Sequence, residues 1–162
     1  MMTLDKNMIW ALDALRYTKA QLKTTANKPG DFIRIWPLIC VRYERGKSTS
    51  SSSAREWTWI HTLASRARHF QCGNCAEHAA VAFVFLQTRG IIPIDYMEGQ
   101  NVDHAFVVIG REQNGKKSHW TTWGPNAVVC DPWAGKCFPA KEIPVKMIGG
   151  SGIQTASAAR LG

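Results

Sequence analysis

The sequence predicts an α+β domain in which a buried helix packs against an antiparallel sheet. Residues 75–88 are apolar on most sides of a helix, which is typical of a buried helix. Four short runs rich in apolar and β-branched residues follow between residues 91 and 130. Between the second and third runs stands Asn114-Gly115, a strong hairpin signal. A helix followed by strands with short connections favours the α+β class.

Two further helices are predicted before the central one. Apolar residues recur at helical spacing from Leu4 to about Lys23, and Asn27-Lys-Pro-Gly30 then ends that helix. Residues 32–43 are apolar but interrupted by Pro37, so they fit an extended segment or a short helix followed by a strand. A second amphipathic helix is predicted from about Ala54 to Arg68.

The central helix is predicted from about Cys75 to Thr88, with Gly90 as its C-terminal stop. The four apolar runs after it are the predicted strands, at residues 91–97, 105–111, 118–123 and 127–130.

Length and composition fit one domain. The chain has 162 residues, 45% of them hydrophobic, which is enough for a substantial core. We expect a single domain over residues 1–148, a mobile polar loop at about 44–53, and a flexible tail of small residues over 149–162. No apolar run is long enough to cross a membrane. The first residues lack the basic region and cleavage site of a signal peptide, so we expect no cleavable leader.

Three residues in separate contexts point to nucleophilic catalysis. Cys75 lies at the predicted N-terminus of the central helix, where unpaired N–H groups and the helix dipole stabilise a thiolate. His104 precedes an apolar strand, and Asp131 ends another, immediately before a proline. A thiol, an imidazole that takes its proton and a carboxylate that orients the imidazole form a catalytic triad.

The motifs around these residues resemble the papain-like cysteine enzyme superfamily, in the broad group that includes the transglutaminase core and bacterial effector and toxin proteases and deamidases. They are residues 73–79 (Gly-Asn-Cys-Ala-Glu-His-Ala), 103–110 (Asp-His-Ala-Phe-Val-Val-Ile-Gly) and 128–134 (Val-Val-Cys-Asp-Pro-Trp-Ala). The ordered set covers roughly residues 71–140 and is specific to the superfamily but not to a substrate. The resemblance implies a papain-like or transglutaminase-like core, with the nucleophile on the central helix and the sheet packed against it.

The resemblance also implies a role for each site residue. Cys75 would be the nucleophile, His104 the general base and acid, and Asp131 the orienting carboxylate. Relatives complete the oxyanion hole with a polar side chain shortly upstream, for which Gln71 and Asn74 are the candidates and Gln71 is preferred. No cofactor and no metal are implied. No aromatic residue follows Cys75 and the glutamine spacing differs from papain, which favours a toxin-type or transglutaminase-like branch.

The function implied is that of a bacterial effector or toxin that deamidates Gln or Asn side chains of a target protein. A cysteine protease or a transglutaminase with the same triad is the alternative. Targets of relatives are frequently small GTPases, so we expect a protein substrate in the cytosol of a target cell, with export by a specialised secretion system. A secretion chaperone or an immunity protein would be a further partner.

Other interpretations remain open. Cys72 competes with Cys75 as nucleophile, and Cys72, Cys75, His78 and His104 could instead hold a metal ion. The formal charge of +8 also fits a non-catalytic binding module that docks on an acidic partner. The basic residues are dispersed, which argues against nucleic-acid binding as the main function.

The five cysteines cannot all pair within one chain, so a reducing compartment is the simpler expectation. Cys130 and Cys137 flank a short turn and could be close enough to pair under oxidising conditions.

Overall fold

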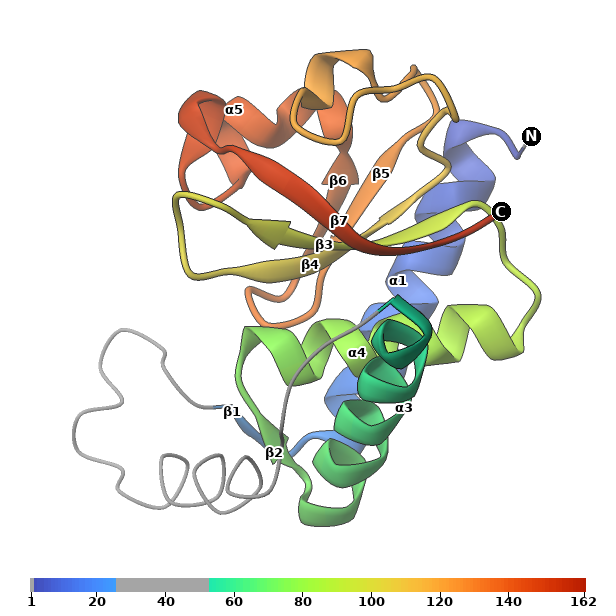
Figure 1. Ribbon diagram of the computed structural model, residues 1–162, viewed down its shortest axis with the longest axis vertical. Coiled ribbons are helices and arrows are strands. Elements are labelled where there is room, and N and C mark those ends of the chain that lie inside the picture. Colours follow the sequence, from blue (N-terminus) through green and yellow to red (C-terminus); the bar gives the residue numbers. More distant parts are fainter. Residues whose placement is uncertain (1, 26–52) are drawn as a thin grey trace.

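A five-stranded antiparallel sheet forms the centre of the computed structural model, which describes residues 2–25 and 53–162 (Figure 1). The strands lie in the order β6-β5-β4-β3-β7, and each neighbouring pair is antiparallel. Their bounds are Ile94–Gly99 for β3, Ala105–Ile109 for β4, Val128–Asp131 for β5, Lys136–Pro139 for β6 and Thr155–Leu161 for β7. The predicted α+β class and the antiparallel sheet are therefore confirmed.

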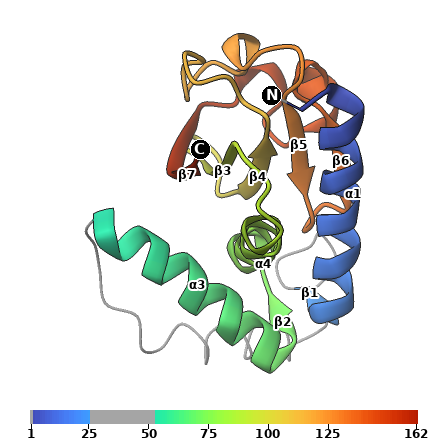
Figure 2. The same ribbon diagram turned by 90° about the vertical axis from the view of Figure 1, so that its right-hand side faces the viewer.

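Three long helices lie on one side of this sheet. They are α1 (Leu4–Gln21), α3 (Ser53–Phe70) and α4 (Cys75–Thr88), close to the three predicted helices. Both α1 and α4 pack on the sheet, and α3 packs on α4 from outside (Figure 2). A short parallel pair, β1 (Thr24–Thr25) with β2 (Cys72–Gly73), joins the end of α1 to the start of α4. Among the described residues, no helix combines the length and apolar character needed to cross a bilayer.

The alternation of side chains along the strands divides the core into two layers. In β4, Val107 and Ile109 face α1 and α4, while Phe106 and Val108 face the other way. The second layer is covered by short elements: η2 (Trp120–Thr122), η3 (Ala140–Glu142), α5 (Ile143–Lys146) and η4 (Gly150–Gly152). Trp123 is fully buried in this layer. Both faces of the sheet are thus covered, and α4 lies on the face that the long helices cover.

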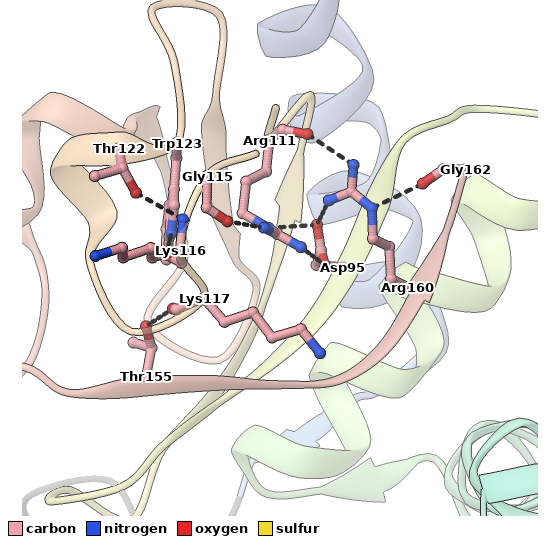
Figure 3. A network of polar contacts seen from close by, with 10 residues as sticks. All are labelled: Asp95, Arg111, Gly115, Lys116, Lys117, Thr122, Trp123, Thr155, Arg160 and Gly162. Atoms are coloured by element: carbon pink, nitrogen blue, oxygen red, sulfur yellow. Dashed lines mark hydrogen bonds and ion pairs between the residues drawn. The ribbon is translucent and has the colours of Figure 1, made fainter. Parts of the chain in front are cut away.

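The predicted flexible tail at 149–162 is wrong, because Thr155–Leu161 forms β7 at the edge of the sheet. Ladder pairing with β3 holds β7, and side chains reinforce it: Arg160 donates to the Asp95 carboxylate, which also binds Arg111 (Figure 3). The small residues that indicated disorder are instead those of a flat edge strand, whose partner lies far away in the sequence.

The predicted strand at 118–123 is also wrong. Trp120–Thr122 is a short 3-10 helix, and the Thr122 hydroxyl accepts a hydrogen bond from the N–H of Lys116 (2.8 Å). A Cβ at Gly115 would lie 2.6 Å from the carbonyl oxygen of Thr122, so the glycine allows a tight loop here. Asn114-Gly115 therefore belongs to a compact loop. The consecutive strands β3 and β4 pair as a hairpin, and so do β5 and β6, of which β6 was not predicted. The predictions for residues 32–43 and for the loop at 44–52 lie outside the described residues.

Candidate active site

The first turn of α4 is built by the residues that surround Cys75. Asn74 is the N-cap, and its side-chain oxygen accepts a hydrogen bond from the N–H of Ala76 (3.0 Å). Glu77 accepts in return from the N–H of Asn74 (2.8 Å), which completes a capping box. A Cβ at Gly73 would lie 2.3 Å from Cβ of Glu77, so only glycine fits there. These contacts make Cys75 the first residue of the helix.

The capping contacts leave one N–H group of this turn available. Asn74 accepts from Ala76 and Glu77 through its side chain and from His78 through its carbonyl oxygen. Among the residues that the structure describes, the N–H of Cys75 has no hydrogen-bond partner. A free N–H at a helix N-terminus, on the same residue as the thiol, can bind an oxyanion that forms there.

His104 and Asp131 meet because β4 and β5 are antiparallel neighbours. The start of β4 lies beside the end of β5, where Val107 pairs with Cys130. His104 directly precedes β4, Asp131 is the last residue of β5, and both are buried. The ring Nε2 of His104 lies 2.6 Å from Oδ2 of Asp131, while Oδ1 of Asp131 accepts from the N–H of Ala134 (3.0 Å). The N–H of Ala134 therefore fixes the carboxylate, and the carboxylate in turn orients the imidazole.

Cys75 completes the arrangement on the other side of the imidazole. The thiol of Cys75 lies close enough to the ring of His104 to raise the pKa of the imidazole together with Asp131. Since Nε2 is held by Asp131, Nδ1 is the ring nitrogen left to face the thiol. The sulfur of Cys75 also lies 4.0 Å from the carbonyl oxygen of Asp103. The structure thus brings together the three residues that the sequence singled out.

The electrostatics favour a charged imidazole. Burial lowers the pKa of His104, but the hydrogen bonds to Asp131 and Cys75, together with the charges of both groups, raise it to about 9. The ring is therefore an imidazolium at neutral pH, and its positive charge lies beside the sulfur of Cys75.

Two aromatic rings surround His104, and the sequence analysis gave neither a role. The Trp133 ring meets the imidazole edge to face with centroids 5.5 Å apart, and Phe106 stacks beside it at 6.1 Å. Trp133 stands two residues after Asp131, within the third motif. This closeness in sequence to the triad carboxylate is the signal that could have predicted its place in the site. The two rings thus pack against the imidazole of the buried pair of His104 and Asp131.

The candidates for an oxyanion-hole side chain are placed differently from the expectation. Gln71 is exposed and precedes β2, so the whole of that short strand and Asn74 separate it from Cys75. The side-chain oxygen of Asn74 is engaged in the N-cap. The N–H of Cys75 is the donor carried by the same residue as the thiol, and the role of Gln71 in the oxyanion hole stays a prediction.

Cys72 is disulfide-bonded, whereas Cys75, Cys130 and Cys137 are free. Cys72 thus has no thiol with which to attack a substrate or bind a metal, and a disulfide differs from the reducing environment that we expected. His78, the third group of the metal interpretation, is buried with Nδ1 2.7 Å from the carbonyl oxygen of Asn74. Within residues 2–25 and 53–162, no three His, Cys, Asp or Glu side chains are grouped to hold a metal ion.

Cys130 and Cys137 face each other across β5 and β6, as the sequence suggested, but both are free. A hydrogen bond to Cys137, then burial, then the charges of Cys137 and Asp131 raise the pKa of the Cys130 thiol well above its usual value. Cys130 therefore stays protonated at neutral pH.

No protein-family model, no curated protein and no solved structure matches this chain.

Proposed function

We propose that this chain is a cysteine-dependent acyl-transfer enzyme on a papain-like or transglutaminase-like core, and that it deamidates Gln or Asn side chains of a protein. The observation that carries the proposal is the convergence of three side chains: Nε2 of His104 lies 2.6 Å from Asp131, and the thiol of Cys75 lies close to the same imidazole. These three residues are distant in sequence but converge in the fold. One imidazole nitrogen lies on the carboxylate, and the other is left for the thiol. That is the arrangement a thiol nucleophile requires.

The first half-reaction uses Cys75 and His104. The Cys75 thiolate attacks the carboxamide carbon, and the oxygen gains a negative charge that the N–H of Cys75 stabilises. The His104 imidazolium donates its proton to the leaving nitrogen, the C–N bond breaks, and ammonia departs. The side chain is then a thioester with Cys75.

The second half-reaction returns the enzyme to its starting state. Neutral His104 takes a proton from water, and the resulting hydroxide attacks the thioester carbon. The C–S bond breaks, Cys75 leaves as the thiolate beside the imidazolium, and the product carboxylic acid loses its proton to the departed ammonia or to water. Asp131 keeps Nε2 of His104 engaged throughout, so the ring presents Nδ1 to the reacting atoms.

By the same resemblance, we propose an effector or toxin that is delivered by a specialised secretion system to the cytosol of a target cell. Its substrate there would be a protein such as a small GTPase.

Peptide mass spectrometry on a lysate treated with wild-type or Cys75→Ala protein tests the reaction. We expect gains of about one mass unit at Gln or Asn residues with the wild type and none with Cys75→Ala. Cys137→Ala is the matched control, because it removes a free thiol away from the triad and should act as the wild type does.

Other products would redirect the proposal. New chain termini would identify a protease, and cross-linked peptides a transglutaminase, with the same first half-reaction. If wild type and Cys75→Ala gave identical peptide maps across several lysates, catalysis by Cys75 would be refuted.

A further inference from the structure

The short helix α5 presents an apolar side chain almost entirely to solvent. Val145 is 87% exposed, and Ile148, three residues later, is 44% exposed. The segment is nevertheless anchored, because Ile143 and Met147 are buried in the second core layer. Val145 and Ile148 are therefore held outward by a packed element.

Exposed lysines surround these two side chains. Lys141 and Lys146 belong to the same segment, and Lys136 begins the adjacent strand β6. The one acidic side chain between residues 132 and 154, Glu142, is paired with Lys146. We call the surface formed by Lys136, Lys141, Val145, Lys146 and Ile148 the α5 surface. Its charge is positive even with this pair formed.

Contacts link the α5 surface to the candidate active site. Lys136 lies opposite Asp131 in the β5–β6 pairing, and its Nζ is 3.5 Å from the carbonyl oxygen of Lys146. On the other side, a Cβ at Gly149 would lie 3.2 Å from a methyl group of Val102, two residues before His104. Figure 1 shows α5, the turn between β3 and β4 and the start of α4 toward the left of the view, with α5 and α4 on opposite faces of the sheet.

We propose that the α5 surface docks an acidic segment of the protein substrate that also carries apolar side chains. Carboxylates would pair with the lysines, while apolar side chains would cover Val145 and Ile148. This proposal rests on the proposed function, because a segment bound here lies next to the residues that neighbour His104 and Asp131. Binding away from the reacting amide raises the local concentration of substrate without altering the chemistry at Cys75.

An acidic polypeptide fits this surface better than a lipid bilayer does. Lys136 lies opposite Asp131, and its Nζ contacts the carbonyl oxygen of Lys146 at the end of α5, so these two lysines lead from the surface toward the site. A surface that binds a bilayer has a broad basic face around several apolar side chains. An extended chain needs only a narrow strip of lysines.

Binding is measured by fluorescence anisotropy on Cys75→Ala protein, so that the test needs no catalysis. The probes are a labelled 12-residue peptide of alternating Glu and Leu with one central Gln, and the same peptide with Lys in place of Glu. We expect the acidic peptide alone to bind. The triple variant Lys141→Glu, Val145→Ser, Lys146→Glu should weaken that binding at least tenfold.

The matched control is Lys6→Glu with Ile9→Ser on α1, where both side chains are exposed on a helix that covers the opposite face of the sheet. It should bind the acidic peptide as the parent does. Equal loss in the control, equal binding of the basic peptide, or no binding of either would overturn the proposal.

Two further measurements separate the docking proposal from its rivals and from the proposed function. Sedimentation with phosphatidylserine–phosphatidylcholine vesicles that depends on these residues, without peptide binding, would assign the surface to a membrane. The rate of Cys75 alkylation by iodoacetamide, located by peptide mapping, should be unchanged in the α5 triple variant on the Cys75 background. A slow rate already in the wild-type protein would count against the catalytic site and not against docking.

Discussion

Two buried charged clusters lie on this sheet, and they differ in what their hydrogen bonds leave open. In the cluster of Asp95, Arg111 and Arg160, both carboxylate oxygens accept from guanidinium groups (Figure 3). The remaining guanidinium donors reach carbonyl oxygens of Gly115, Arg111 and Gly162. Every group named here is engaged, so the cluster can hold strands together but has nothing to offer a substrate.

The cluster of Cys75, His104 and Asp131 is closed at one end only. Asp131 is fixed by His104 and by the N–H of Ala134. Among the described residues, the N–H of Cys75 has no partner, and the thiol, apart from its approach to His104, makes only a long contact (4.0 Å) with the carbonyl oxygen of Asp103. Buried charges are costly, and they persist where structure or chemistry requires them. The comparison teaches that the completeness of the hydrogen bonds separates a structural cluster from one that can react.

The largest effect on stability should come from Asp95→Asn. The change leaves the buried Arg111 without its carboxylate, and breaking a buried pair in this way costs about 3–5 kcal/mol. We expect the free energy of unfolding to fall by that amount and the melting temperature to fall by roughly 10 °C. Urea denaturation at pH 7 measures the first and a thermal scan the second.

The reactivity of Cys75, in the other cluster, should not change when Asp95 is replaced. Alkylation of Cys75 per folded molecule should stay within twofold of the wild type in Asp95→Asn, since the Asp95 carboxylate binds Arg111 and Arg160. Asp131→Asn, by contrast, should slow the alkylation of Cys75, because His104 loses its orienting charge. If Asp95→Asn slowed alkylation as much as Asp131→Asn does, the two clusters would not be separate.

A pH dependence of stability should arise from His104. Its pKa is about 9 in the folded protein against an ordinary value of 6.5, so folding favours the protonated ring. The stabilisation is complete below pH 6.5 and is lost as the pH rises through 9. The shift corresponds to about 3 kcal/mol. Urea unfolding at pH 6, 7, 8 and 9 should therefore show falling stability across that window.

His104→Gln isolates this contribution. The difference in unfolding free energy between wild type and His104→Gln should shrink from pH 6 to pH 9. Asp95→Asn should keep the wild-type pH dependence, because its cluster contains no histidine. A difference that is constant with pH would show that the folded protein does not favour the imidazolium.

The triad and the three long helices could be predicted because their signals are local. Cys75 follows a capping sequence, and His104 and Asp131 stand at the ends of apolar strands, so each position is visible in a short stretch. The antiparallel order of β4 and β5 then brings the last two together. The papain-like core and the reaction stay predictions.

The rest depended on partners distant in the chain. Thr155–Leu161 looks like a loose tail until β3 is beside it, and the role of Asp95 appears only when Arg111 and Arg160 converge on it. The preference for Gln71 stays a prediction; the pairing of β2 with β1, which the sequence analysis did not foresee, sets the backbone between Gln71 and Asn74.

The strand β3 connects the two clusters, and Tyr96 gives the smallest and most specific prediction. Neighbouring strand residues point to opposite faces, so Asp95 faces the arginines while Tyr96 faces α4. The buried Tyr96 hydroxyl donates a hydrogen bond to the carbonyl oxygen of Ala76 (3.2 Å), next to Cys75. It ties the sheet that carries His104 to the first turn of the helix that carries the thiol.

Tyr96→Phe removes this hydroxyl and keeps the ring that packs on Trp59 and Phe83. We expect a loss of about 1 kcal/mol in unfolding free energy, as for one hydrogen bond. Cys75 alkylation should slow several-fold, because the thiol and the imidazole are then less well aligned. Ile92→Ala, at an exposed position before the same strand, is the control and should change neither quantity. A loss of stability at an unchanged alkylation rate would show that Tyr96 supports the fold alone, and that only the capping box positions Cys75.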